Sequence, residues 1–261
     1  MEAADFADHI PQKGIRKRWG TILGQAETVL RTHNTKITSF LTPGEWGYAE
    51  SLLSHFIDLR WMLEGGYQDA ERRRLIMMPD YRTPEDLAPS VAFLRATHKA
   101  AMKTLTHRDY LGAVLSMGIE REMIGDILVY HHSACIVVVP ELKEYLMWHL
   151  DSVGSVGVTV EGIDEIPESA TLDELEVIMG TVASLRLDAV LSVALRISRQ
   201  KAQALIKSQK VSVNWKPVQK QTVALHEHDI ISIQGSGRLK LLKVGVLSRS
   251  HRWQIEIGKM K

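Results

Sequence analysis

The chain has 261 residues, of which 45% are hydrophobic, an ordinary content for a globular protein that excludes a disordered or fibrous one. Its formal net charge of +1 hides an asymmetry, because residues 185–261 carry a net charge of +11 and residues 1–184 a net charge of −10. A compact block with that many cations repels itself unless an anionic partner lies beside it, and nucleic acid is the commonest such partner. The charge distribution therefore indicates a nucleic-acid-binding module in the last third of the chain.

The single cysteine, Cys135, excludes an intramolecular disulfide and is typical of a reducing compartment. The acidic residues at the start of the chain have no apolar run behind them, so we do not expect a secretory signal. The longest strongly apolar run, Ala134–Val139, is far shorter than the roughly 20 residues that a spanning helix needs. We therefore expect a cytoplasmic protein without stable membrane insertion.

Residues 1–70 are predicted to be a mostly helical N-terminal region. Ile22, Ala26 and Val29 recur at helical spacing before the Pro-Gly break at residues 43–44. A second helix is expected from Glu45 to the glycines at 65–66, on an apolar stripe made of Leu52, Leu53, Phe56, Leu59 and Leu63.

Residues 71–165 are predicted to form a ferredoxin-like βαββαβ domain. Thr106 with Asp109 three residues later indicates a helix start, and Pro140 suits the first turn of a second helix over Glu141–Leu150. RNA-recognition motifs share this fold, but they stack bases on aromatic side chains of the inner strands, and residues 135–139 supply none. The strand candidates are Val91–Ala96, Ile124–Tyr130, Ala134–Val139 and Val156–Val160.

Residues 166–184 are predicted to be an acidic linker. Residues 151–184 contain eight acids and no lysine or arginine, and Glu161–Pro167 interrupts any regular element. This acidic segment either folds back electrostatically on the basic module or is a solvated tether.

Residues 185–261 form the basic module, which is predicted to contain two short helices and several strands. Leu187, Val190, Leu191 and Ala194 fall at the spacing of an amphipathic helix. Ser198 is the predicted N-cap of the second helix, and the expected strands include Val211–Val213 and Ile230–Ile233.

Two cations stand at an unusual place in the second helix. Arg199 and Lys201 lie in its first turn, where the helix macrodipole disfavours positive charge. A phosphate group would benefit there from both side chains and from the free helix N–H groups. The placement is either a phosphate site or a solvated charged face.

Several short motifs of the module belong together: Arg186-Leu-Asp188, Ile197-Ser-Arg199, Ala202, Ile206, Val211-Ser-Val-Asn214 and Asp229–Ile233. They resemble the αL RNA-binding domain first defined in the fourth small-subunit ribosomal protein. Gln209 and Trp215 depart from it, since members usually carry glycine at both positions. Trp215 either changes the hairpin tip or presents an aromatic ring to a base.

Three further segments, Gly65–Arg74, His107–Gly112 and Met117–Ile127, are similar to segments of the YlmH family, so the resemblance spans roughly residues 45–261. It implies an α+β protein with N-terminal helices, a ferredoxin-like middle domain and a small αL RNA-binding domain. It also implies binding to rRNA of the large ribosomal subunit. In bacterial relatives it implies a role on stalled subunits that hold peptidyl-tRNA, which leaves tRNA open as a second partner. One cyanobacterial and plastid branch carries a photosystem II label, so a photosystem II assembly or scaffold factor is the alternative function.

No catalysis and no cofactor are expected. Arg186-Leu-Asp188 resembles the catalytic loop of pseudouridine synthases, but the Thr-Ser-Gly element that follows there is missing, so Asp188 is read as starting or capping a helix. The run Arg72–Arg74 is either a solvated strand edge or a second RNA contact. Two histidine-containing groups lack four ligands at zinc spacing, so no metal site is predicted; they are His131, His132 and Cys135, and His226 with His228.

The predicted RNA-binding residues combine cations for phosphates with polar side chains for sugar or base edges. Replacing Arg199 and Lys201 by alanine is expected to weaken RNA binding and to leave thermal stability nearly unchanged. The set comprises Arg186, Ser198, Arg199, Lys201, Gln203, Lys207, Lys210, Asn214, Lys216, Lys220, Arg238 and Lys240.

Overall fold

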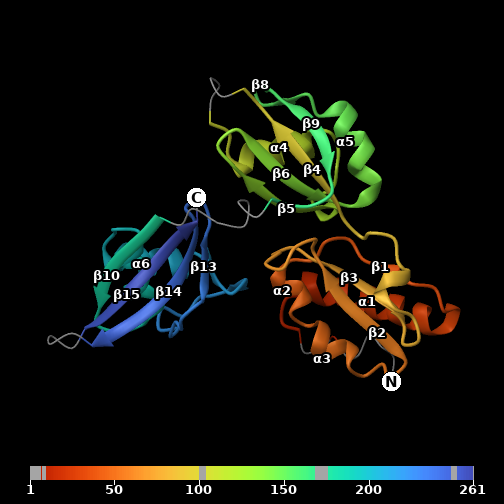
Figure 1. Ribbon diagram of the computed structural model, residues 1–261. Helices are drawn as coiled ribbons and strands as arrows, with labels where there is room; N and C mark the ends of the chain where they lie inside the picture. Colours follow the sequence, from red (N-terminus) through yellow and green to blue (C-terminus); the bar gives the residue numbers. More distant parts are fainter. Residues whose placement is uncertain (1–6, 8–9, 100–103, 168–175, 248–251, 261) are drawn as a thin grey trace. The chain divides into compact units, whose positions relative to one another are not determined.

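The structure is a computed structural model, and it describes residues 7, 10–99, 104–167, 176–247 and 252–260. The chain divides into two compact units, Met1–Thr171 and Leu172–Lys261, and the first unit contains two separate main sheets (Figure 1). Among the described residues, no helix combines the length and the apolar character that crossing a membrane requires.

The N-terminal part of the first unit is a small antiparallel sheet, in the order β1-β3-β2, with a long helix packed against it. Trp19, Leu23 and Ala26 are buried on one side of that helix because they recur at helical spacing. The elements are α1 (Lys13–Thr32), β1 (Lys36–Ile37), α2 (Pro43–Trp46), α3 (Ala49–Leu53), β2 (Leu59–Glu64) and β3 (Arg74–Pro79).

The helix predicted from Glu45 to residue 64 is wrong in its second half. After the short helices α2 and α3, the chain forms the strand β2. Leu59, Trp61 and Leu63 alternate along β2 and pack against one apolar cluster, which is the period of two that a strand requires. The predicted boundary at residue 70 also differs from the structure, because β3 pairs with β2 in the N-terminal sheet.

The middle domain has the predicted ferredoxin-like βαββαβ order, and its sheet is antiparallel in the order β5-β6-β4-β9. The last predicted strand is displaced, because Val156–Gly157 (β8) pairs with Ser152–Val153 (β7) and the sheet strand begins at Thr159. The sheet elements and their helices are β4 (Ala92–Thr97), α4 (His107–Ser116), β5 (Ile124–Val129), β6 (Ser133–Val138), α5 (Lys143–His149) and β9 (Thr159–Ile163).

Local sequence signals explain both helices of this domain. Asp109 Oδ2 accepts hydrogen bonds from the backbone N–H of Thr106 at 2.8 Å and from its hydroxyl at 2.7 Å, so the predicted capping box begins α4. A 3₁₀ turn that starts at Pro140 leads into α5. Tyr110 of α4 and Leu146 of α5 are buried in the same core, on the same face of the sheet.

The second unit is a sheet with the strand order β10-β15-β14-β13-β11-β12 and two helices, α6 and α7, whose buried side chains belong to the core that lines one face of the sheet (Figure 1). Both helices and the strands at Val211–Val213 and Ile230–Ile233 confirm the predictions. The elements are β10 (Glu176–Val182), α6 (Leu187–Ala194), α7 (Arg199–Lys207), β11 (Val211–Val213), β12 (Lys216–Pro217), β13 (Ile230–Ile233), β14 (Gly237–Leu247) and β15 (Trp253–Met260).

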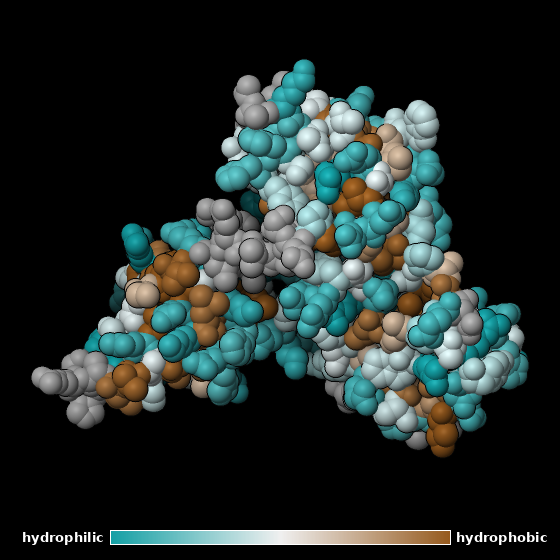
Figure 2. Space-filling view, viewed as in Figure 1, coloured by the Kyte–Doolittle hydropathy of each residue, from teal (hydrophilic) through white to brown (hydrophobic). Residues whose placement is uncertain are grey.

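The predicted acidic linker is wrong from Glu176 onward. Residues 176–182 form β10, which pairs along its whole length with β15, while residues 168–175 of the predicted linker lie outside the described residues. Ile178 and Val182 face the core of the second unit, and Val177 and Met179 are 51% and 75% exposed. Figure 2 shows hydrophobic side chains at the surface of this unit.

Candidate nucleic-acid interface

A buried carboxylate organises the predicted RNA-binding residues. Asp188, in the first turn of α6, is fully buried and accepts hydrogen bonds from Arg186, Arg199 and Gln203. Arg199 approaches it with two nitrogens, at 3.0 and 3.3 Å, and Arg186 does the same at 3.1 and 3.3 Å. The amide of Gln203 adds a third donor at 2.9 Å. Arg199 and Gln203 can both reach it because positions i and i+4 share one face of α7.

The ionised form of Asp188 is strongly favoured over the protonated form. Burial alone would raise the pKa of Asp188, but hydrogen bonds from Arg199, Gln203 and Arg186 outweigh burial and lower the pKa to about 2. Its carboxylate therefore stays ionised at neutral pH and does not act as a general acid. As predicted, Asp188 lies at the start of α6, in its first turn; the N-cap is Arg186, and the Asp188 side chain binds three neighbouring side chains.

The arginines that bind Asp188 remain partly open to solvent. The side chain of Arg186 is 38% exposed and that of Arg199 is 50% exposed. Each guanidinium has five N–H donors, and only two of its nitrogens contact the carboxylate. The remaining N–H donors can bind an external anion. Because Arg199 is anchored to a buried charge, we expect its replacement to lower stability, and we keep the expectation of nearly unchanged stability for Lys201.

Exposed lysines extend this group along α7. Ser198 caps the helix by accepting the backbone N–H of Lys201 at 3.3 Å, as predicted, and the first turn of α7 contains no acid. Lys201, Lys207 and Lys210 are exposed, and within the described parts of the chain none of them makes an ion pair. Asp188 therefore pairs with Arg199, whereas these exposed lysines have no acidic partner among the described residues.

The hairpin tip at residues 214–215 has the left-handed backbone conformation that glycine adopts most easily. Asn214 and Trp215 have φ angles of +47° and +61°, as expected for a two-residue type I′ turn. The amide of Asn214 donates to Asp229 at 2.8 Å and accepts the backbone N–H of Ile230 at 2.9 Å. Its polar atoms therefore hold the hairpin against β13. Gln209, the other departure from the family pattern, has φ +58°.

The twelve predicted residues do not share one surface. Leu239 and Leu241 of β14 are buried on the helix-covered face of the sheet, so the alternating Arg238 and Lys240 lie on the opposite face. The residues around Asp188 and along α7 form one group, which we call the α7 group: Arg186, Ser198, Arg199, Lys201, Gln203, Lys207 and Lys210. Lys216 and Lys220, both exposed, follow the hairpin.

The arginine run of the first unit serves the fold. Arg72 donates through Nε to the carbonyl oxygen of Ile124 at 2.9 Å. Arg73 lies over the ring of Trp46, 5.1 Å from its centroid, and Arg74 is only 8% exposed. Burial lowers the pKa of both Arg72 and Arg74. The prediction of a solvated strand edge is therefore wrong.

Asp126 ties the same segment to the middle domain. It accepts hydrogen bonds from the hydroxyl of Tyr67 at 2.8 Å and from the backbone N–H groups of Glu71 at 2.7 Å and Arg72 at 3.1 Å. Burial raises the pKa of Asp126, against these hydrogen bonds, which lower it. Two of the segments that resemble the YlmH family, Gly65–Arg74 and Met117–Ile127, are thus in direct contact.

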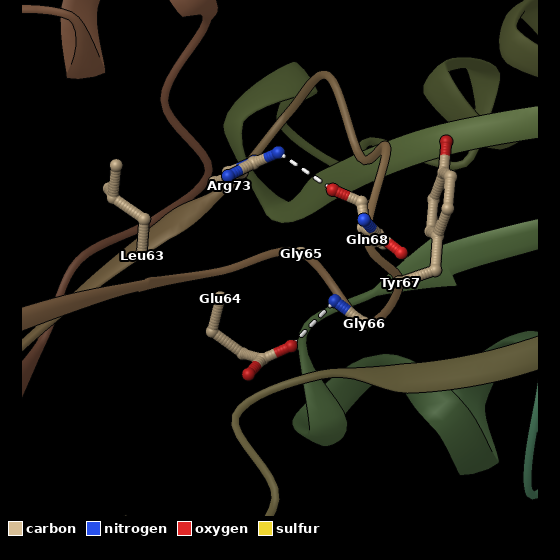
Figure 3. Close-up of a pocket in the computed structure, with 7 residues that line it drawn as sticks. All are labelled: Leu63, Glu64, Gly65, Gly66, Tyr67, Gln68 and Arg73. Carbon is tan, nitrogen blue, oxygen red and sulfur yellow. Dashed lines mark hydrogen bonds between the residues drawn. The ribbon is translucent and has the colours of Figure 1, made fainter.

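A shallow pocket of about 310 Å³ lies along this segment (Figure 3). Its polar groups are bonded to one another: the Gly66 N–H donates to Glu64 at 2.6 Å, and Arg73 donates to the carbonyl oxygen of Gln68 at 2.9 Å. These contacts hold the loop in shape, and the pocket does not indicate a particular ligand. The lining residues are Leu63, Glu64, Gly65, Gly66, Tyr67, Gln68 and Arg73.

The sheet face of the middle domain that lies opposite its helices is partly covered. A Cβ at Gly125 would lie 2.8 Å from the ring of Phe40, which comes from the N-terminal part. A Cβ at Gly66, whose φ is +89°, would lie 2.4 Å from the ring of Phe93. RNA-recognition motifs expose aromatic rings on this face, and here Phe93 packs against the chain itself.

The histidine groups do not form a metal centre in the described parts of the chain, where no three His, Cys, Asp or Glu side chains gather as metal ligands. Cys135 is buried, and the exposed His131 and His132 have ring centroids 6.1 Å apart. His226 lies 3.8 Å from Asp229.

Comparisons with known proteins agree with this architecture. Residues 16–82 match the family model "YlmH, N-terminal", residues 84–166 match "Putative RNA-binding domain in YlmH", and residues 185–231 match the S4 domain. The "Ribosome-associated protein quality control protein P2" of Bacillus subtilis (strain 168) is 31% identical over 233 residues, which cover 89% of this chain and 90% of that protein. The solved structure of "Cell division protein ylmH from Streptococcus pneumoniae" shares the fold, with a TM-score of 0.51 and 23% identity over 62% of this chain and 96% of that one.

These matches fit an RNA-binding protein that is not an enzyme. The S4 model coincides with α6, α7 and the hairpin, the region that contains the α7 group. With a relative of this identity covering nearly the whole chain, and two family models side by side in its first unit, the protein belongs to the YlmH family.

Proposed function

We propose that this protein binds structured RNA of the large ribosomal subunit through the α7 group and acts in ribosome-associated quality control. The observation that carries the proposal is the buried Asp188 that holds Arg186 and Arg199 in fixed positions beside unpaired lysines. Preorganised guanidinium groups bind phosphate with less loss of side-chain entropy than free ones do. The printed name of the B. subtilis relative supports the ribosomal setting.

In this proposal the cations of the α7 group bind phosphates, and peptidyl-tRNA is a second RNA partner. The protein is cytoplasmic and bound to large subunits. Neither relative's name concerns photosynthesis, so those relatives give the photosystem II alternative no support.

The test is RNA binding by the full chain as a function of salt, measured by fluorescence anisotropy with a labelled rRNA hairpin. Binding should fall steeply with salt, because each neutralised phosphate releases counterions. Lys201→Ala should reduce the slope of log K against log [salt] by about 1. Lys17→Ala, an exposed lysine of the first unit, is the matched control and should leave the slope unchanged.

Lys240→Ala separates the two faces of the C-terminal sheet. If the α7 group is the binding surface, Lys240→Ala has a smaller effect than Lys201→Ala, since Lys240 lies on the face away from α7. An affinity that does not change with salt, or a larger effect at Lys240, contradicts the proposal. In cell extracts, the protein should sediment with large subunits and be released by salt.

A further inference from the structure

The middle domain presents an aromatic patch on the outer side of α5, which lies along one face of the sheet (Figure 1). Trp148 is 79% exposed and Tyr145 is 40% exposed. They lie three residues apart and therefore on one face of the helix, while Leu146 and Leu150 are buried in the core. A tryptophan this exposed contributes little to the stability of the domain that carries it.

The ring of Tyr145 is held in place by its neighbour. His149 stacks on it, with ring centroids 4.5 Å apart and an angle of 23° between the planes. The Nδ1 atom of His149 lies 2.8 Å from the carbonyl oxygen of Tyr145. The patch is thus partly ordered in advance, which lowers the entropy that a binding partner must overcome.

Carboxylates border these rings. Glu144 precedes Trp148 by four residues within α5, so this acid lies beside the tryptophan on the helical surface. Glu141 lies in the 3₁₀ turn before α5, where its charge acts on Arg74. Both acids are exposed, as is Asp151 just beyond α5. The whole domain, residues 84–166, contains 12 acids against 6 lysines and arginines, a net charge of −6.

This chemistry disfavours RNA on the middle domain. A net charge of −6 repels phosphates, and the sheet face that RNA-recognition motifs use is partly covered by Phe40 and the Gly66 loop. Cations are favoured instead, because they pair with carboxylates and bind the faces of aromatic rings, tryptophan best of all.

We propose that the outer face of α5 docks a basic segment of a partner protein, whose lysine or arginine side chains lie between Glu144 and the rings of Trp148 and Tyr145. Tryptophan and tyrosine are the residues that most often dominate the energy of a protein interface. This inference does not depend on RNA binding by the C-terminal unit, because the two surfaces belong to different units.

The experiment measures anisotropy of a labelled peptide that alternates arginine with serine, titrated with the full chain. The same peptide with glutamate in place of arginine is the charge control, and a short single-stranded RNA is the rival ligand. We expect Trp148→Ala to weaken arginine-peptide binding about tenfold, as for a tryptophan at the centre of an interface. Glu144→Gln should weaken it as well, and RNA affinity should be unchanged in both variants.

Ile57→Ala is the matched control, because Ile57 is a hydrophobic residue of the same unit that is 91% exposed. It should change peptide affinity by less than about twofold, as surface substitutions generally do. Trp148→Phe, which keeps an aromatic face, should retain most of the binding. Equal peptide affinity for the wild type and Trp148→Ala overturns the proposal, and so does a loss of RNA binding with peptide binding intact.

Discussion

Replacing Asp188 by asparagine tests the central contact of the C-terminal unit, because the side chain keeps its size and loses its charge. The pKa of Asp188 falls from 3.8 to about 2 on folding, which corresponds to about 2.5 kcal/mol of stabilisation by the ionised form. Asp188→Asn should therefore destabilise this unit by about 2–3 kcal/mol at pH 7. Asp188→Ala, which also removes the partner of Gln203, should cost about 3–5 kcal/mol.

The pH dependence of this difference has a definite sign. Because the folded-state pKa lies below the ordinary value, the contribution of Asp188 is complete above pH 3.8 and is lost as the pH falls toward 2. The difference in unfolding free energy between the wild type and Asp188→Asn should then be constant from pH 5 to 8. It should close in acid.

The assay is urea unfolding of the full chain, followed by the amide NMR signals of α6 and α7, which report on the C-terminal unit by itself. The carboxyl carbon of Asp188, titrated by NMR, gives its pKa directly. Asp164→Asn, at an exposed acid of the first unit, is the control and should have almost no effect. A gap below about 1 kcal/mol at pH 7, or a carboxyl that titrates near its ordinary value, would refute the reasoning.

Four further substitutions have expected outcomes. Arg199→Ala should lower the free energy of unfolding of the C-terminal unit, whereas Lys201→Ala should change it by less than about 0.5 kcal/mol; urea titration compares them. Tyr67→Phe removes a hydrogen bond to the buried Asp126 and should lower the free energy of unfolding of the first unit by about 1 kcal/mol. An unchanged free energy of unfolding would contradict this prediction. Gly66→Ala should cost at least about 1 kcal/mol in the same assay, because φ is +89° and its Cβ would meet an aromatic ring; wild-type stability would contradict that.

The elements of the middle domain could be predicted because their signals are local. The capping box of Thr106 and Asp109 and the apolar strand at residues 134–139 each lie within a few residues of sequence. The strand β10 could not be found in this way. Its acidic surroundings suggested a tether, and its partner β15 begins more than 70 residues later in the chain.

The residues of the candidate site could be proposed from the sequence, whereas their arrangement in space could not. The cations at the start of α7 stand out because they oppose the helix dipole. The role of Asp188 depends on three side chains, Arg186 just before α6 and Arg199 and Gln203 of α7, which meet only in the folded unit. By contrast, the separation of Arg238 and Lys240 from α7 follows from the two-residue period of β14, once that strand is recognised.

The pairing of β10 with β15 sets an order of events during synthesis. β10 is the first strand of its unit to be made, and the strand that covers its edge is the last, beginning at Trp253. At about 5–20 residues per second, roughly 4–14 s pass between them. During this interval β10 lacks the strand that pairs with it, and an unpaired strand edge is a template for pairing with another chain. Among the described strands, β10 stands at one end of the finished sheet, so β15 covers one of its two edges and the other stays open.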